Sequence, residues 1–455
     1  MSKKMLCGAL CLAVLAMGLS GAWAAETIAQ PDGKLPDMTK PVQVFILTGQ
    51  SNMVGLGRVA VLENAVKNKK KYPYLVDADG KWTVRPDVRF VRFMQGRGLL
   101  NNDWLAIKGG TIGPEFGIGH VLGDALDAPV MVLKSCIGNR SLGWDLLPPG
   151  SERFTVVKKD RAGAEKTYVY AGYKDKPAFW EADPAKGKAT APPPWLGRDG
   201  KPIDWYAGRN YDDDTADAKK ALADLGKYYP GATKYEVAGF FFWQGEKDLG
   251  DPVHAENYEK NLVRFIKSLR KDFNAPNAKF VMGTLGEAAK GIGGNEGLIL
   301  NAHLAVDGAS GKHPEFKGNV ATVYTHPMAQ GGSGNGHYGG NAEVYMEVGE
   351  AMGRAMVELL LNSAAQTGER QKGAISEVFG QVEKVDTTAS TVTVSIPSIP
   401  GKEGRSMTFE VNTDTKIHGV ENNELSELRK GAQVAVRYKD AGANAVAVSI
   451  HLAVE

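Results

Sequence analysis

The chain has 455 residues, with 54 Lys and Arg against 52 Asp and Glu and a formal net charge of +2 at pH 7. A near-neutral chain exerts no long-range attraction on polyanions, so neither nucleic acid nor an acidic membrane is expected as a partner. The chain holds three cysteines, Cys7, Cys11 and Cys136. Because Cys7 and Cys11 lie within the first 24 residues, which are expected to be removed, a framework of disulfide bonds is excluded.

Residues 1–24 have the pattern of a secretory signal peptide. "MSKK" is basic, an apolar run rich in small residues follows, and "AWA" is a small-x-small cleavage site. Loss of Lys3 and Lys4 with this segment takes the net charge from +2 to 0 and leaves Cys136 as the last cysteine. We therefore expect a secreted or periplasmic protein, with an N-terminal membrane anchor as the alternative. No later stretch is long and apolar enough to span a bilayer.

From residue 40 to residue 362, apolar runs alternate with amphipathic helical patterns. The runs are QVFIL, PVMVL, EVAGFFFW, KFVMGTL and NVATVYT. Continuous apolar runs are typical of strands that are covered on both faces. Over 253–273 and 341–361, apolar residues recur at three- and four-residue steps, which predicts helices. This alternation predicts an α/β domain with a mostly parallel sheet between two layers of helices.

Residues 145–210 interrupt this pattern. The segment is rich in Pro, Gly and aromatic residues and has no clear period, as is typical of a functional or disordered excursion. Its aromatic residues are either platforms for sugar rings or packing residues; they are Trp180, Trp195, Trp205 and Tyr206.

Residues 362–373 are polar and form a candidate linker. In residues 374–455, which follow it, the apolar residues no longer alternate between strand-like and helix-like patterns. Their short β-branched runs, such as STVTVSI and QVAVRY, are separated by turn residues. We expect a small antiparallel β-barrel or sandwich there, an accessory domain without a titratable cluster.

Polar residues stand at the ends of the predicted strands. "GQSNM" follows the first strand and places Ser51 at its carboxyl end, where open α/β sheets form their sites. "KSCIGNRSLGW" runs into a turn with a free Gly138 N–H. "WQGEKD" ends a third strand with Gln244 and Glu246, and "GSGNGHYGG" puts His337 just before the last helix. A nucleophile, oxyanion donors and a base at one sheet edge are what acyl transfer requires.

In combination these motifs resemble the SGNH-hydrolase superfamily, and within it the sialate O-acetylesterase-like group that includes carbohydrate esterase family 6. The resemblance covers about residues 40–362 and implies a three-layer, flavodoxin-like α/β/α fold. It implies that Ser51 is the nucleophile and that His337 is the base. It also implies an oxyanion hole made by Ser51, Gly138 and Gln244. Neighbouring polar residues are expected to bind the substrate, namely Gln50, Asn52, Asn139 and Arg140.

Two positions depart from the family pattern. Asn139 stands where the family often has a second glycine. The aspartate that the superfamily usually carries three residues before the histidine is Gly334 here. Glu246 is therefore the candidate for the third triad member. Its alternative role is to hold the GQSN turn or Arg140, and a backbone carbonyl could orient His337 instead.

His326 is the rival base, and Cys136 is the rival nucleophile unless it is a buried, inert thiol. The chain has no closely spaced His/Cys set, so neither a metal nor a cofactor is expected. The sequence thus predicts a secreted serine esterase that removes O-acetyl groups from a carbohydrate, such as an acetylated polysaccharide or sialic acid, through an acyl-enzyme. Two alternatives stay open: a non-catalytic carbohydrate-binding protein on a degenerate hydrolase scaffold, and an esterase for non-sugar esters.

Overall fold

The structure is a computed structural model, and it describes most of the chain beyond the first segment. The described residues are 28, 30–160, 162–183, 185–187, 190–367, 375–396, 405–413, 415–420, 422, 424–440 and 445–452. The predicted signal peptide, residues 1–24, and the second half of the linker candidate lie outside these residues.

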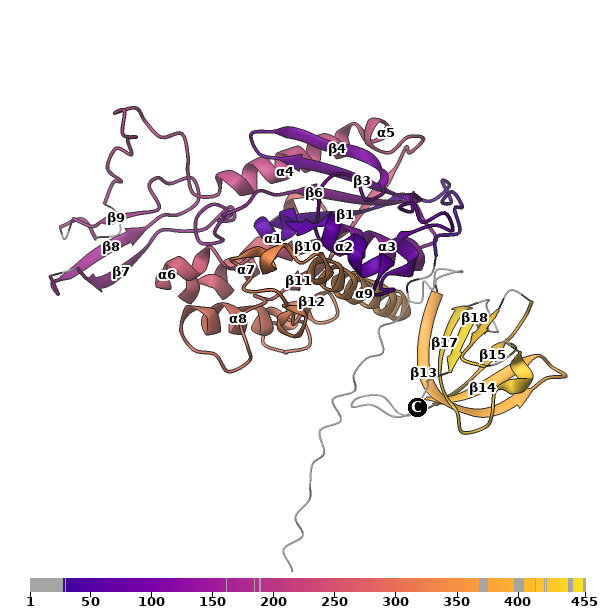
Figure 1. Ribbon diagram of the computed structural model, residues 1–455. Helices are drawn as coiled ribbons and strands as arrows, with labels where there is room; N and C mark the ends of the chain where they lie inside the picture. Colours follow the sequence, from indigo (N-terminus) through magenta and orange to yellow (C-terminus); the bar gives the residue numbers. More distant parts are fainter. Residues whose placement is uncertain are drawn as a thin grey trace, which may run out of the picture.

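Within the described residues, seven strands form the central sheet, in the order β12-β11-β10-β1-β6-β3-β4 (Figure 1). Neighbouring strands run parallel except β3 and β4, which form an antiparallel hairpin at one edge. The strands are β1 (Val42–Gly49), β3 (Arg85–Met94), β4 (Gly98–Leu105), β6 (Val130–Ser135), β10 (Tyr235–Trp243), β11 (Lys279–Gly283) and β12 (Val320–Val323). The predicted α/β class with a mostly parallel sheet is confirmed. The five predicted apolar runs are all strands of this sheet, whereas β3 and β4 were not predicted.

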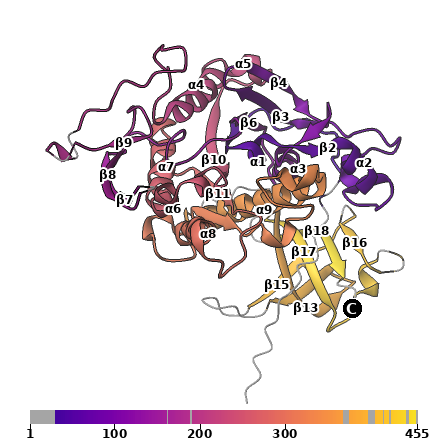
Figure 2. The ribbon, with the colours of Figure 1, turned by 60° about the vertical axis from the view of Figure 1, so that its left-hand side comes forward.

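Helices cover both faces of this sheet (Figure 2). In β1, Phe45 and Leu47 point into one hydrophobic core, and Val44 and Ile46 point into the other. The first core is closed by α2 (Val59–Lys67), α3 (Glu115–Ala125) and α9 (Ala342–Thr367). The second is closed by α4 (Arg209–Ala223), α7 (Tyr258–Asp272) and α8 (Gly294–Val306).

Shorter elements connect these layers. The short α-helices are α1 (Ser51–Val54), α5 (Leu225–Tyr228) and α6 (Pro252–Glu256). A two-stranded ladder joins β2 (Gly57–Arg58) and β5 (Thr111–Ile112). The 3-10 helices are η1 (Pro73–Leu75), η3 (Asp248–Gly250), η4 (Pro314–Phe316), η5 (His326–Met328), η6 (His337–Gly340) and η7 (Leu425–Glu427).

The excursion at residues 145–210 contains a three-stranded antiparallel sheet that projects from the domain (Figure 1). Its strands are β7 (Phe154–Lys159), β8 (Glu165–Tyr170) and β9 (Phe179–Glu181). The rings of Phe154, Tyr170 and Phe179 stack across the three strands, with centroids 5.4 and 5.3 Å apart. Such cross-strand aromatic pairs stabilise short ladders. This part of the excursion is therefore regular, although its sequence shows no clear period.

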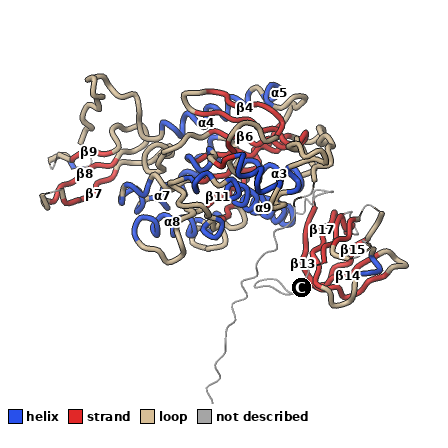
Figure 3. The backbone as a smooth tube through the Cα atoms, viewed as in Figure 1, coloured by secondary structure: helices blue, strands red, loops and turns tan. Residues whose placement is uncertain are grey.

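The C-terminal region is built from strands, as Figure 3 shows. They are β13 (Ile375–Asp386), β14 (Thr391–Ile396), β15 (Arg405–Glu410), β16 (Lys416–His418), β17 (Gln433–Asp440) and β18 (Ala445–Leu452). The sheet closes on itself where β15 pairs with β18. The predicted antiparallel pattern is wrong for two pairs, since β15 and β16 both run parallel to β18. An ion pair of 2.6 Å joins Arg437 to Asp124 of α3.

Candidate active site

The GQSNM motif begins where β1 meets β10. Gly49 has a φ of 146°, and a Cβ atom there would lie only 2.3 Å from the carbonyl oxygen of Trp243. No side chain fits at this position, so the motif must start with glycine. The next amide, Gln50 N, donates to the same Trp243 carbonyl at 3.2 Å. The chain then enters α1 at Ser51, which is half-buried at the carboxyl end of the strand.

Ser51 faces the loop that follows β6. A Cβ atom placed on Gly138 would lie 3.3 Å from the Ser51 Cβ. Within the described residues, neither the Ser51 N–H nor the Gly138 N–H donates a hydrogen bond. Two free N–H groups beside a serine are the donors that an oxyanion needs. Asn139 has a φ of 60°, a left-handed conformation that asparagine tolerates better than most residues, so the departure from a second glycine preserves the turn.

Glu246 holds the turn that carries Ser51. Its Oε2 accepts a hydrogen bond of 2.5 Å from Gln50 Nε2, and its Oε1 accepts one from Asn52 Nδ2. Asn52 is fully buried; its Nδ2 also donates to Gly334 O at 3.1 Å, and its Oδ1 accepts from Tyr345 at 3.2 Å. Gln50 and Asn52 were predicted to bind substrate, but their side chains form hydrogen bonds within the protein instead. Burial, and then the charge of nearby Glu287, raise the pKa of Glu246 to about 7.

Gln244 lies beneath the site with no exposed surface. Its Nε2 donates to Asp248 Oδ2 at 2.6 Å and to Arg140 O at 2.9 Å, and its Oε1 accepts from Tyr258 at 2.7 Å. A side-chain amide has two protons, and both are used here. Gln244 therefore does not donate to an oxyanion, although this was expected. It holds the loop of residues 136–145, which follows β6 and carries Gly138 and is called the oxyanion loop below, through the Arg140 carbonyl.

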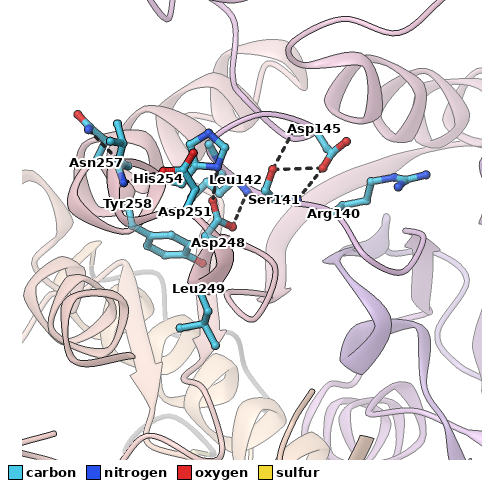
Figure 4. Close-up of polar contacts among 12 residues, drawn as sticks. Arg140, Ser141, Leu142, Asp145, Asp248, Leu249, Asp251, His254, Asn257 and Tyr258 are labelled. Atoms are coloured by element: carbon cyan, nitrogen blue, oxygen red, sulfur yellow. Dashed lines mark hydrogen bonds and ion pairs between the residues drawn. The ribbon is translucent and has the colours of Figure 1, made fainter. Parts of the chain in front are cut away.

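Two buried aspartates fix the same loop, as Figure 4 shows. Asp145 Oδ2 accepts from Ser141 N at 2.8 Å. The Asp248 carboxylate accepts from Leu142 N and from Gly143 N, both at 2.8 Å. Burial raises the pKa of Asp248. These hydrogen bonds to backbone N–H groups restrain the conformation of the loop that carries Gly138.

His337 lies on a left-handed turn. His337 and Tyr338 have φ values of 53° and 51°, and Gly339 and Gly340 continue the turn. Non-glycine residues in this region cost roughly 1–2 kcal/mol each and persist only where packing imposes them. Here the fully buried Tyr338 ring stacks on Trp243 at 5.9 Å and anchors the turn. Strain of this kind often marks a functional residue.

The turn that carries His337 packs next to α1, but the His337 side chain forms no hydrogen bond with Ser51 among the described residues. Asn52 bonds to Gly334 O, and His337 N bonds to that same carbonyl at 3.0 Å. In the part of the chain that is described, the His337 imidazole makes no hydrogen bond, either with Ser51 or with Glu246. Catalytic hydrogen bonds are often loose before substrate binds. Of the two roles left open for Glu246, its contacts favour holding the turn, and its place in the triad stays a prediction.

Glu287 is a residue that the sequence analysis missed. Its Oε2 accepts from Gly334 N at 3.0 Å. A Cβ atom on Gly334 would lie 2.6 Å from Glu287 Oε2 and 2.7 Å from Glu246 Oε1. These two carboxylates occupy the space that an aspartate would need, which explains the glycine three residues before His337. A signal existed, because "LGE" after β11 repeats the Gly-Glu pair of "QGE" after β10.

The rival site residues are less suited to the chemistry. Cys136 is buried, and burial raises the pKa of its thiol to about 12, which leaves almost no thiolate at neutral pH. His326 is held through Nδ1, 2.8 Å from Gly286 O. No cluster of three or more His, Cys, Asp or Glu that could hold a metal ion occurs among the described residues. The described helices include none with the length and apolar character needed to cross a membrane.

Two tryptophans of the excursion, Trp180 and Trp205, differ in burial and in their contacts. Trp180 is buried and lies under the Arg153 guanidinium, at 5.3 Å, so it is a packing residue. Trp205 is half-buried, donates from Nε1 to Asp145 at 3.1 Å, and carries the Arg140 guanidinium over its ring at 4.8 Å. Trp205 and Arg140 therefore lie together at the oxyanion loop.

A half-buried serine at the end of a central parallel strand, beside two free N–H groups and a histidine turn, is the arrangement of α/β esterases. Residues 197–358 match the family model described as carbohydrate esterase, sialic acid-specific acetylesterase. The resemblance to the sialate O-acetylesterase-like family, which the motifs predicted, is confirmed over these residues. The matched span includes Glu246 and His337, whereas Ser51 and Gly138 precede it.

Solved structures resemble the chain at low identity. A protein from Arabidopsis thaliana is 15% identical, with coverage of 70% of this chain and 98% of that one and a TM-score of 0.38. A carbohydrate acetylesterase from Xanthomonas citri is 12% identical, with coverage of 89% and 74% and a TM-score of 0.34. Silver-bound CusF from Escherichia coli is 19% identical, with coverage of 18% and 98% and a TM-score of 0.16. No curated protein matches the chain.

Proposed function

We propose that the protein is a secreted serine esterase that removes O-acetyl groups from a carbohydrate. One observation carries the proposal: Ser51 faces Gly138, with both N–H groups free, at the carboxyl edge of the sheet. The match of residues 197–358 to a carbohydrate esterase family supports it. The pattern of residues 1–24 supports export. A serine hydroxyl next to a preformed pair of donors is suited to acyl transfer.

The reaction proceeds through an acetyl-enzyme. His337 takes the proton of Ser51 Oγ, which attacks the ester carbonyl carbon. The negative charge that forms on the carbonyl oxygen is held by the N–H groups of Ser51 and Gly138. When the tetrahedral intermediate collapses, His337 protonates the departing sugar hydroxyl. Water, deprotonated by His337, then attacks the acetyl group and releases acetate and free Ser51.

Glu246 acts in this scheme through the turn. Its carboxylate fixes Gln50 and Asn52, the two neighbours of Ser51, so that the hydroxyl and the N–H keep their direction. Preorganised donors are worth more than mobile ones because no reorganisation is needed during the reaction. Glu246 is therefore proposed as a positioning residue for the nucleophile, and His337 works without a carboxylate in direct contact.

The test compares wild type with Ser51→Ala and with Ser268→Ala, a half-buried serine of α7, as the matched control. Hydrolysis of 4-nitrophenyl acetate, acetylated carbohydrates and longer acyl esters is measured. We expect wild type and Ser268→Ala to prefer acetylated carbohydrates, and Ser51→Ala to lose at least about 10³-fold in rate. A folded wild type without turnover would favour a binding protein. Faster turnover of longer, non-sugar esters would favour the other alternative.

A further inference from the structure

Lys134 is a buried cation in the central sheet. It lies in β6, a strand that is buried along its whole length, and its side chain has no exposed surface. Its Nζ donates to Met53 O at 2.9 Å, to Val54 O at 3.0 Å and to Glu115 Oε2 at 2.5 Å. An ammonium group carries three protons, so these three hydrogen bonds use all of its donors.

Stability alone does not account for this buried ion pair. Taking an ammonium and a carboxylate out of water costs free energy that their attraction often does not offset, and apolar residues of similar volume are frequently as stable. The pair is nevertheless closely fitted at its Glu115 end, where Oε1 accepts from Gly113 N at 3.2 Å. A Cβ atom on Gly113 would lie 2.4 Å from Glu115 Oε2 and 3.0 Å from Lys134 Nζ, so glycine makes room for the pair. Such an arrangement points to a role besides stability.

The two carbonyls that Lys134 binds belong to the helix that carries Ser51. This helix, α1, has four residues, Ser51–Val54, and a helix so short is not stable by itself. Glu246 holds its beginning through the two neighbours of Ser51, and Lys134 holds its last two carbonyls. Lysine side chains commonly bind the free carbonyls at the end of a helix. The two contacts together restrain α1 at both ends.

Lys134 also belongs to the strand that leads into the oxyanion loop. Gly138 follows it by four residues, and a Cβ atom on Gly138 would lie 3.3 Å from the Ser51 Cβ. One side chain therefore connects the strand that continues to the Gly138 N–H with the helix that carries the Ser51 hydroxyl. A shift of α1 against β6 would change the position of this hydroxyl relative to that N–H.

We propose that Lys134 is a positioning residue, whose ammonium fixes α1 against β6 and so sets the distance between Ser51 and Gly138. Glu115 supplies its counter-charge. The inference rests on the proposed function and adds to it a residue that touches neither the ester nor the Ser51 side chain. Its loss should lower kcat and leave KM unchanged, because a shift of about 1 Å can cost about 100-fold in rate while the ester still binds.

The first test separates positioning from stability. Lys134→Met removes the donor of two carbonyls and leaves the Glu115 carboxylate unpaired, and both melting temperature and kcat should fall. The double variant Lys134→Met, Glu115→Gln buries no charge and should regain part of the melting temperature. Its kcat should stay about 10- to 100-fold below wild type at an unchanged KM. A wild-type kcat in the double variant would overturn the proposal, and this comparison holds even where the single variant does not fold.

Lys279→Met is the matched control. Lys279 is also a buried lysine of the central sheet, but it begins β11 and so lies at the amino end of its strand, away from the edge that carries Ser51. Hydrolysis of 4-nitrophenyl acetate is measured well below the melting temperature of each protein. We expect Lys279→Met to keep the kcat of wild type. An equal fall in kcat in this control would overturn the proposal, because the loss of any buried lysine would then be enough.

The second test measures the geometry at Ser51 without turnover. Methylboronic acid forms a tetrahedral adduct on a reactive serine, which resembles the intermediate of ester hydrolysis, whereas acetate binds as the product. Calorimetry should show methylboronic acid bound more weakly to the double variant than to wild type, by about the factor that kcat loses, and acetate bound equally. Equal binding of methylboronic acid to both proteins would contradict the role of Lys134. Failure of the proposed function would appear separately, as absence of acetyl ester hydrolysis in the wild type.

Discussion

Glu246 should make the folded protein less stable as pH rises through the neutral range. The carboxyl group is 4% exposed and lies close to Glu287, and these two causes raise its pKa from 4.5 to about 7. In the unfolded chain both causes disappear. The folded protein therefore holds the Glu246 proton more tightly than the unfolded chain does, which links stability to pH.

The sign and size of the effect follow from this difference. Below about pH 4.5 the group is protonated in both states, and its contribution to stability is fully present. Between 4.5 and about 7 the unfolded chain releases the proton first, so the free energy of unfolding falls as pH rises. The interval corresponds to about 3 kcal/mol, and the loss is complete above the folded-state pKa.

Urea denaturation at a series of pH values from 4 to 8 measures this contribution. In Glu246→Gln the titrating group is absent. Between pH 4 and pH 8, the fall in the free energy of unfolding should therefore be about 3 kcal/mol smaller in this variant than in wild type. Glu63→Gln, which alters a half-exposed surface carboxylate next to Lys67, serves as the control and should follow the wild type. Glu287→Gln should narrow the difference, because one cause of the shift is removed. Parallel pH curves for wild type and Glu246→Gln would refute the reasoning.

Three further predictions concern the loop, the core and the domain boundary. Gly138→Ala places a methyl group 3.3 Å from the Ser51 side chain, so kcat should fall by about 10- to 100-fold at an unchanged melting temperature. Its control is Gly110→Ala, where a Cβ atom meets nothing within 4 Å, and equal kcat values in both variants would place Gly138 away from the chemistry. Lys134→Met leaves the buried Glu115 without its partner and should lower the free energy of unfolding by about 3–5 kcal/mol in urea, whereas a loss below about 1 kcal/mol would contradict this coupling. Truncation after residue 367, where α9 ends, should leave a folded protein that hydrolyses small soluble esters, and a soluble but inactive product would show that the β-strand region completes the site.

The fold was predictable where burial is uniform along a strand. β1, β6 and β10 are apolar on both faces, and their sequences show continuous apolar runs. β3 was missed because it contains arginines in a pattern that resembles a surface segment. Arg89 of β3 is nevertheless buried, since its guanidinium bonds to Asn102 and to Tyr228 O. Only the folded chain provides those partners, so no local signal marks the strand.

The candidate site was predictable to the extent that it depends on strand ends. Parallel strands bring their carboxyl ends to one edge, which places Ser51 beside Gly138. The role of Gln244 was not accessible in this way, because Tyr258 and Asp248 bury it and take its hydrogen bonds. The position of Glu287 next to Gly334 depends on the path of two loops, which residue types do not specify.

The central claim is that Ser51 forms the covalent intermediate. The most direct measurement treats the protein with a serine-directed fluorophosphonate and identifies the modified peptide by mass spectrometry. The account predicts a single adduct on Ser51, loss of acetylesterase activity in step with labelling, and no adduct in Ser51→Ala. An adduct on another residue, or full ester turnover by Ser51→Ala, would contradict it.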